Sequence, residues 1–284
     1  KDGFMVAQAE GWEIEESGLV KFDFLGLETL NITKKVLDFI EKKSEWLEDI
    51  SLTDEKVYEM LREGDSVGVF QLESDGMRNL AKNMGVDSFE VILALLALYR
   101  PGPLDWAPDF VERKHGNMEI TYEHPLMEGI LKETYGIMLY QEQVMQVVNQ
   151  LAGFTLAEAD LLRRAMGKKK HDVMEAQRQK FIEGAAKHNN IQNRLADKIF
   201  DNIFKFAGYG FNKSHSAAYA MISYQTAYLK ANYPVCYMCS LLSSEVDNSD
   251  KIVKYMEECK EMEIETFFPD VNESFSKFTV VGNG

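Results

Sequence analysis

The chain has 284 residues, of which 45% are hydrophobic, and this is enough to bury one large core or two modest ones. It contains no apolar run of about 18 residues and no basic leader followed by an apolar stretch, so we expect a cytoplasmic protein that does not enter a membrane. The formal net charge of −15 excludes a uniformly basic nucleic-acid-binding surface, so any contact with phosphate groups must be local.

The first predicted element is a short strand at residues 19–25. Side chains alternate along a strand, so Lys21 and Asp23 would point the same way and stand roughly 7 Å apart. This pair suits a ligand that carries both a metal ion and a phosphate, with Asp23 on the metal and Lys21 on a phosphate oxygen. The alternative is an edge strand whose two charges are simply exposed to solvent.

Most of the later sequence is predicted to be helical, because its apolar residues recur three or four positions apart. The expected helices cover residues 28–43, 53–64, 89–98, 144–153, 155–167, 195–206 and 216–232. Residues 266–281 have a β-like pattern instead.

Capping residues support several of these boundaries. Gly64 and Gly153 are expected to end two of the helices. A T-x-x-E capping box at residues 155–158 is expected to begin another, and Asp87 with Glu90 resembles a second box.

The three cysteines, Cys236, Cys239 and Cys259, offer two interpretations. The C-x-x-C spacing of the first two is found in zinc half-sites and redox pairs, but no second pair and no nearby histidine accompanies it. We therefore expect buried free thiols in a reducing compartment.

The positive charge is concentrated in residues 160–180, where seven basic residues face three acidic ones. Arg163 and Arg164 fall in the last turn of a predicted helix, and their long side chains could converge on one bulky anion such as a triphosphate. The alternative is that they only complement the negative end of the helix dipole. The run Lys168, Lys169 and Lys170 exceeds what a dipole requires, and we expect it to contact phosphate groups.

Residues 208–220 combine glycines, hydrogen-bond donors and aromatic side chains. Gly208 and Gly210 let the backbone approach a ligand closely, and Tyr209, Phe211 and Tyr219 could stack on bases. The donors precede a helix N-terminus, which favours a bound phosphate. They are Asn212, Lys213, Ser214 and His215. The alternative is an ordinary turn between helices, with Ser214 as the N-cap.

Five motifs occur in order along the chain. They are FQLES at residues 70–74, YRPGP at 99–103, YQEQVM at 140–145, LLRRAMGKKK at 161–170 and FAGYGFNKSHSAAYA at 206–220. From about Gly18 to its end, the chain thereby resembles the C-family of bacterial replicative DNA polymerases, the DNA polymerase III alpha subunits. The resemblance implies a complete protein that transfers nucleotides from dNTP to a primer 3′-hydroxyl under the direction of a template.

The resemblance also implies a mainly α fold with three parts. Residues 1–50 would be the end of the palm, a short α/β remnant of a nucleotidyltransferase fold related to polymerase beta. Residues 51–270 would form the helical fingers domain, and residues 271–284 would begin a β-containing region.

The same resemblance assigns roles to individual residues. Asp23 matches a catalytic, metal-binding aspartate of the palm, and Lys21 matches a palm lysine that contacts the triphosphate. Arg163 and Arg164 match fingers arginines that grip the triphosphate. The complete site would hold two Mg²⁺ ions, but two further aspartates lie in a motif that this sequence lacks, so we expect the chain to be inactive alone.

The implied partners are primer–template DNA and dNTP. In the complete protein, the sliding clamp, the clamp-loader tau subunit and a proofreading exonuclease would bind through regions outside this sequence. The alternative is a non-catalytic helical module that binds nucleic acid through its basic patch alone.

Overall fold

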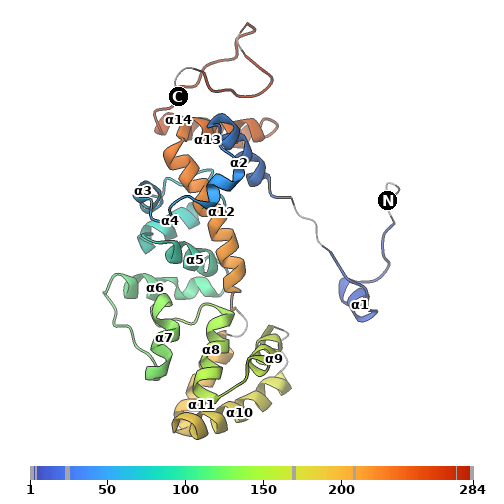
Figure 1. The fold of residues 1–284 in the computed structure, drawn as a ribbon, viewed down its shortest axis with the longest axis vertical. Coiled ribbons are helices and arrows are strands. Elements are labelled where there is room, and N and C mark those ends of the chain that lie inside the picture. Colours follow the sequence, from blue (N-terminus) through green and yellow to red (C-terminus); the bar gives the residue numbers. More distant parts are fainter. Residues whose placement is uncertain are drawn as a thin grey trace.

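The computed structural model describes residues 3, 5–22, 26–167, 171–206, 209–272 and 274–281, and nearly all of its regular structure is helical (Figure 1). In these ranges the β structure is limited to one isolated parallel bridge between Tyr140 and Phe211. The predicted mainly α fold is therefore confirmed. None of the helices in the described ranges combines the length and the hydropathy needed to span a bilayer.

The elements follow one another with short connections. In chain order they are α1 (Gly11–Glu16), α2 (Glu28–Phe39), the 3-10 helix η1 (Ser44–Glu48), α3 (Glu55–Glu63), α4 (Asp75–Met84), α5 (Phe89–Leu98), η2 (Pro103–Trp106), α6 (Ala107–Lys114), η3 (Pro125–Met127), α7 (Glu128–Leu131), η4 (Lys132–Thr134), α8 (Gln141–Ala152), α9 (Leu156–Gly167), α10 (His171–Asn189), α11 (Asn193–Phe206), α12 (Lys213–Asn232), α13 (Pro234–Ser244) and α14 (Ser249–Glu261).

The buried apolar side chains form three clusters, which together make one elongated helical body. The first cluster lies where α3, α4 and α5 pack with α12, and the second joins helices α7 to α11. In the third cluster, α2 packs against α13 and the end of α12, and α14 packs against α13. The long helix α12 runs between the two ends of the body, with α2, α13 and α14 at one end and α9 to α11 at the other (Figure 1).

Local capping explains several helix ends. Gly64 and Gly153 adopt left-handed backbone conformations at the ends of α3 and α8, as predicted. The backbone N–H groups of Thr155 and Glu158 donate to each other's side chains at the start of α9, which confirms that capping box.

The second proposed capping box, Asp87 with Glu90, is wrong. Helix α5 begins after Ser88, which makes no side-chain cap hydrogen bond. Asp87 instead accepts a hydrogen bond from Lys114 Nζ at 2.7 Å. A charged partner from α6 thus occupies the carboxylate that was expected to cap α5.

The predicted strand at residues 19–25 is not formed by its described part. Residues 19–22 have no regular secondary structure, and residues 23–25 lie outside the described residues. A strand depends on a neighbouring strand for its backbone hydrogen bonds, and the described ranges contain none. Residues 266–281 were expected to be β-like, and their described positions also lack strand structure.

A buried ion pair ties α12 to α14. Lys230 Nζ pairs with Glu258 and also donates to the backbone oxygens of Asp65 at 2.6 Å and Val67 at 2.9 Å. Burial lowers the pKa of Lys230, while Glu258 opposes this shift.

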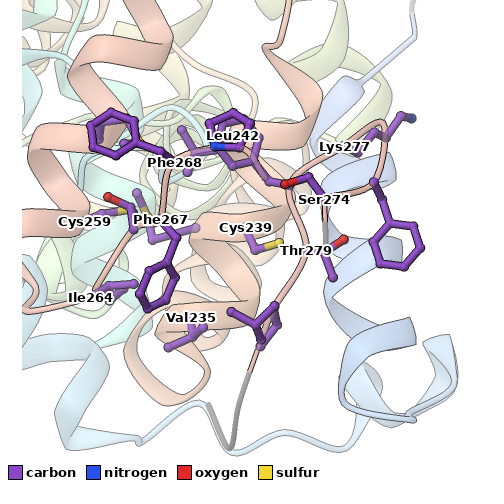
Figure 2. Close-up of a pocket in the computed structure, with 18 of the residues that line it drawn as sticks. Val235, Cys239, Leu242, Cys259, Ile264, Phe267, Phe268, Ser274, Lys277 and Thr279 are labelled. Atoms are coloured by element: carbon purple, nitrogen blue, oxygen red, sulfur yellow. The ribbon is translucent and has the colours of Figure 1, made fainter. Parts of the chain in front are cut away.

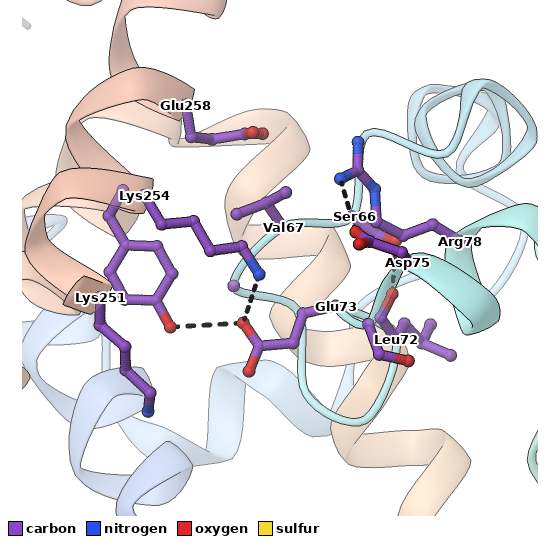
Figure 3. A network of polar contacts seen from close by, with 12 residues as sticks. Ser66, Val67, Leu72, Glu73, Asp75, Arg78, Lys251, Lys254 and Glu258 are labelled. Atoms are coloured by element: carbon purple, nitrogen blue, oxygen red, sulfur yellow. Dashed lines mark hydrogen bonds and ion pairs between the residues drawn. The ribbon is translucent and has the colours of Figure 1, made fainter.

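The loop after α3, which contains Asp65 and Val67, is held by a second set of contacts. Glu73, in the FQLES motif, lies 3.9 Å from Lys254 Nζ and accepts a hydrogen bond from the Tyr255 hydroxyl at 3.3 Å (Figure 3). This motif therefore fixes the loop after α3 against α14.

Candidate nucleotide and phosphate site

Three of the sequence motifs meet where the first and second clusters adjoin. The Phe211 N–H donates to the Leu139 carbonyl at 3.2 Å, and the Gln141 N–H donates to the Phe211 carbonyl at 2.8 Å. These bonds form the parallel bridge and fix the segment before α12 against the start of α8.

Two glycines permit this close approach. A Cβ atom on Gly210 would lie 2.7 Å from Cε1 of Phe206 and 3.1 Å from Cγ of Gln141. Gly102 has a φ of +97°, and a Cβ there would lie 2.4 Å from the ring of Tyr209. The YRPGP turn and the glycine-containing segment therefore pack closer together than side chains at these positions would allow.

Arg100 bridges the same two motifs and was not predicted as a site residue. Its Nη2 donates to the Tyr209 carbonyl at 2.9 Å, and its guanidinium carbon lies 4.2 Å from the centre of the Phe211 ring. Partial burial lowers the pKa of Arg100. An arginine inside a proline–glycine turn was the available signal, but its partner is 109 residues away in sequence.

Arg163 and Arg164 are held together by a single carboxylate. Arg163 Nη2 and Arg164 Nε each lie 2.8 Å from an oxygen of Asp160, one turn earlier in α9. The hydrogen bond from Arg163 is the main reason that the pKa of Asp160 lies below its usual value. The two guanidinium groups thus converge on one anion, which in this structure belongs to the chain itself.

Helix α12 begins at Lys213, three residues earlier than expected. Asn212, and not Ser214, is the N-cap, because its side chain accepts a hydrogen bond from the His215 N–H at 2.8 Å. Glu142 accepts from the Lys213 N–H at 2.9 Å and from Asn212 Nδ2 at 3.1 Å. A carboxylate from α8 therefore takes the favourable anion position at this helix N-terminus.

The remaining donors of this segment face different surroundings. Lys213 Nζ lies 2.8 and 2.7 Å from the two carboxylate oxygens of Glu133. Ser214 and His215 are exposed, and the His215 ring lies 4.3 Å from that of Tyr219. A hollow of about 590 Å³ lies beside Lys213, and its lining includes Glu133 and Glu142.

Comparison with known proteins identifies the family. The family model for the bacterial DNA polymerase III alpha subunit finger domain matches residues 29–189. The DNA polymerase III alpha subunit of Pseudomonas aeruginosa is 49% identical over 99% of this chain and 25% of its own length. The chain belongs to the DNA polymerase III alpha subunit family.

Further relatives in this family give the same result. The alpha subunit of Chlamydia trachomatis is 48% identical over 100% of this chain and 23% of its own length. That of Escherichia coli K12 is 47% identical over 98% of this chain and 25% of its own length. The chain thus spans about a quarter of the alpha subunits that it matches.

Of the two predicted palm residues, the structure describes Lys21 and does not describe Asp23. Lys21 is exposed in the segment around α1, which stands apart from the helical body (Figure 1). Asp23 lies outside the described residues, as do Lys168, Lys169 and Lys170. Their roles stay predictions.

The described residues do not assemble a metal site. They contain no group of three or more histidine, cysteine, aspartate or glutamate side chains that could hold a metal ion. A site for two Mg²⁺ ions would need several carboxylates in one place. The residues described here therefore do not fit such a site without carboxylates from elsewhere.

A second hollow, of about 480 Å³, lies between α13, α14 and residues 264–281. Figure 2 shows Phe267, Phe268 and Leu242 around it, with the thiols of Cys239 and Cys259 nearby. All three cysteines of the chain are free, and the two nearby thiols are buried, which raises their pKa values to about 11. Cys239 and Cys259 are buried as predicted, whereas Cys236 is only half-buried.

Proposed function

We propose that this chain is the part of a replicative DNA polymerase that binds the incoming dNTP and contacts DNA. The complete protein would transfer a nucleotide from dNTP to the 3′-hydroxyl of a primer. The observation that carries this proposal is the convergence of Arg163 and Arg164 on one carboxylate, within a chain of the DNA polymerase III alpha subunit family.

The arginine pair suits a triphosphate for electrostatic reasons. Two guanidinium groups and the Asp160 carboxylate leave one net positive charge at this point of α9. A triphosphate carries more negative charge and more acceptor oxygens than one carboxylate, so it can replace Asp160 as the partner of both arginines. The side chain of Arg164 is 66% exposed and that of Arg163 is 32% exposed, so solvent reaches both.

DNA contacts would come from the two neighbouring basic segments. Lys213 would exchange Glu133 for a backbone phosphate, since both offer paired oxygens to its ammonium group. Asn212, Ser214 and His215 would add donors at the start of α12. Lys168, Lys169 and Lys170 would extend this contact along the DNA.

The palm residues would act only in the complete protein. Asp23 would bind Mg²⁺ together with two carboxylates from outside this chain, and the metal would supply charge neutralisation at the phosphates. Lys21 would contact the triphosphate from the palm side. This chain alone would be inactive, and the clamp, the tau subunit and the exonuclease would bind other regions of the protein.

The proposal is tested in the complete polymerase with Arg163→Ala and Arg164→Ala. Each change should lower kcat/KM for dNTP by about 10- to 200-fold, because a charge-assisted hydrogen bond is worth about 1.5–3 kcal/mol. Arg194→Ala, an exposed arginine on α11, is the matched control and should change kcat/KM little.

DNA affinity separates this proposal from its alternative. Lys168→Ala should weaken DNA binding in a salt-dependent manner and leave dNTP use nearly unchanged. If both arginine variants keep the parent dNTP dependence but lose DNA affinity, the chain is a nucleic-acid-binding module and the triphosphate role is refuted.

A further inference from the structure

The Gln141 side chain connects the arginine pair to the glycine-containing segment. Its Nε2 donates to the Gly210 carbonyl at 3.0 Å, and its Oε1 accepts from Arg163 Nη1 at 3.4 Å. The Gln141 backbone is itself fixed, because its N–H donates to the Phe211 carbonyl at 2.8 Å. The side-chain amide therefore touches Arg163 of α9 and Gly210, while the backbone of the same residue is bonded to Phe211.

Gln143, two residues later, is a glutamine with a purely structural role, and its contacts differ from those of Gln141. Gln143 is 1% exposed, and its Oε1 accepts from the backbone N–H groups of Leu139 and Tyr140 at 2.8 and 3.0 Å. Its Nε2 donates to Thr134 Oγ1 at 2.8 Å. Gln143 thus satisfies the hydrogen-bonding groups of residues that precede α8. Gln141 is instead half-buried and contacts two segments that are distant in sequence.

Close packing holds the Gln141 side chain in place. The missing side chain of Gly210 leaves room for Cγ of Gln141, which lies 3.1 Å from the position a Cβ would take. In the same segment, Arg100 lies over the Phe211 ring. The amide thus contacts a segment that Arg100 also holds.

We propose that Gln141 is a positioning residue for Arg163, a role that rests on the proposed binding of the triphosphate by the arginine pair. Gln141 holds the Arg163 guanidinium at a fixed place relative to residues 209–212, which directly precede α12, the helix proposed to contact phosphate. When the triphosphate replaces Asp160, the hydrogen bond from Arg163 to Gln141 remains and keeps the Arg163 side chain in its position. The arginine pair and the start of α12 then present their donors as one surface.

The expected effect is moderate, because the bond between Arg163 and Gln141 is long at 3.4 Å. Gln141→Met removes both polar atoms and keeps the size and helix propensity of the side chain. In the complete polymerase it should raise the KM for dNTP about 3- to 10-fold and change kcat and DNA affinity less than about 2-fold. Gln150→Met, at an exposed position of the same helix, is the matched control and should leave all three unchanged.

A double-mutant cycle shows whether the effect passes through Arg163. In an Arg163→Ala background, Gln141→Met should add nothing to the KM for dNTP, whereas in an Arg164→Ala background it should keep its full effect. A merely structural glutamine would add the same loss in both backgrounds, and that result overturns the inference. If Gln141→Met fails to fold, Gln141→Asn keeps the amide but is too short to span both partners, and the same cycle applies.

The outcomes distinguish this inference from the proposed function. An unchanged KM for dNTP in Gln141→Met, together with a large loss in Arg163→Ala, overturns the inference alone. An unchanged dNTP dependence in Arg163→Ala overturns the proposed function, and the positioning role falls with it.

Discussion

The helical body and the segment before it differ in how far their apolar side chains are buried. The described part of residues 28–262 buries most of its apolar side chains in three clusters, although Leu156 is 72% exposed. In the preceding segment, Val20 is 71% exposed and Phe22 is 73% exposed. Met5 is fully exposed in the same segment, which stands apart from the body in Figure 1. The body therefore has its own core, while the exposed apolar residues of the segment are typical of a surface that packs against another part of a protein.

The largest loss of stability is expected from removing an aromatic side chain of the core. Phe200 is fully buried in the second cluster, and its ring lies 5.6 Å from that of Phe181. Phe200→Ala should lower the free energy of unfolding by about 3–5 kcal/mol, because the lost burial leaves a cavity. Urea denaturation followed by circular dichroism measures it, and a loss below about 1 kcal/mol would show that the second cluster is not a packed core.

A somewhat smaller effect is expected at the buried ion pair. Lys230→Met leaves Glu258 buried without its partner, so the free energy of unfolding should fall by about 3 kcal/mol at pH 7. The double variant with Glu258→Leu removes both charges and should recover most of this loss. A double variant no more stable than the single one would mean that the lost hydrogen bonds from Lys230 to the Asp65 and Val67 carbonyls, and not the unpaired charge, govern this site.

The start of α9 should contribute less. Thr155→Ala removes the hydroxyl that accepts from the Glu158 N–H, so the free energy of unfolding should fall by about 1 kcal/mol. Thr266→Ala, in the C-terminal segment, is a control that should be nearly neutral. Equal values for the two variants would contradict the capping role.

The same cap should respond to acid. The hydrogen bond from Lys180, followed by those from Thr155, lowers the pKa of Glu158 to about 2. A carboxylate with a depressed pKa in the folded state stabilises the protein above its unfolded pKa, near 4.3, and loses that contribution as the pH falls towards 2. Glu158→Gln should flatten this part of the stability profile. Thermal unfolding measured between pH 5 and pH 2 tests this expectation. A profile that is the same in the variant and the parent would contradict it.

The smallest effect is expected in the N-terminal segment. Val20→Ala should change the free energy of unfolding by less than about 0.5 kcal/mol, because the side chain is already mostly in solvent. Amide exchange should also be fast across residues 5–22 and slow in α5 and α8. Strong protection of residues 19–22 would remove the contrast between the two regions.

The sequence predicted those parts of the fold that depend on local interactions. Helix α5 has the predicted bounds, Phe89–Leu98, and α8 ends at Gly153 as expected, since apolar spacing and caps act within a few residues. The strand at residues 19–25 could not be judged in this way, because strand formation depends on a distant partner. The start of α12 was misplaced because Asn212 and Ser214 are both good N-caps, and only the structure shows which one is used.

The candidate site was only partly readable from sequence. The convergence of Arg163 and Arg164 on an anion was anticipated, but Asp160 was overlooked as their partner, although its spacing of three and four residues was a sufficient signal. The contact of Arg100 with Tyr209 could not be predicted, because no local pattern links residues so far apart. For the same reason, the contacts of Gln141 with Arg163 and Gly210 could not be predicted.

We propose above that Arg163 and Arg164 exchange Asp160 for the triphosphate of an incoming dNTP. The most direct test is a cryo-EM structure of the complete polymerase with primer–template DNA and a dNTP. We expect guanidinium nitrogens of both arginines to lie about 3 Å from triphosphate oxygens, with Arg163 still bonded to Gln141. A triphosphate bound elsewhere, with both arginines still paired to Asp160, would contradict it.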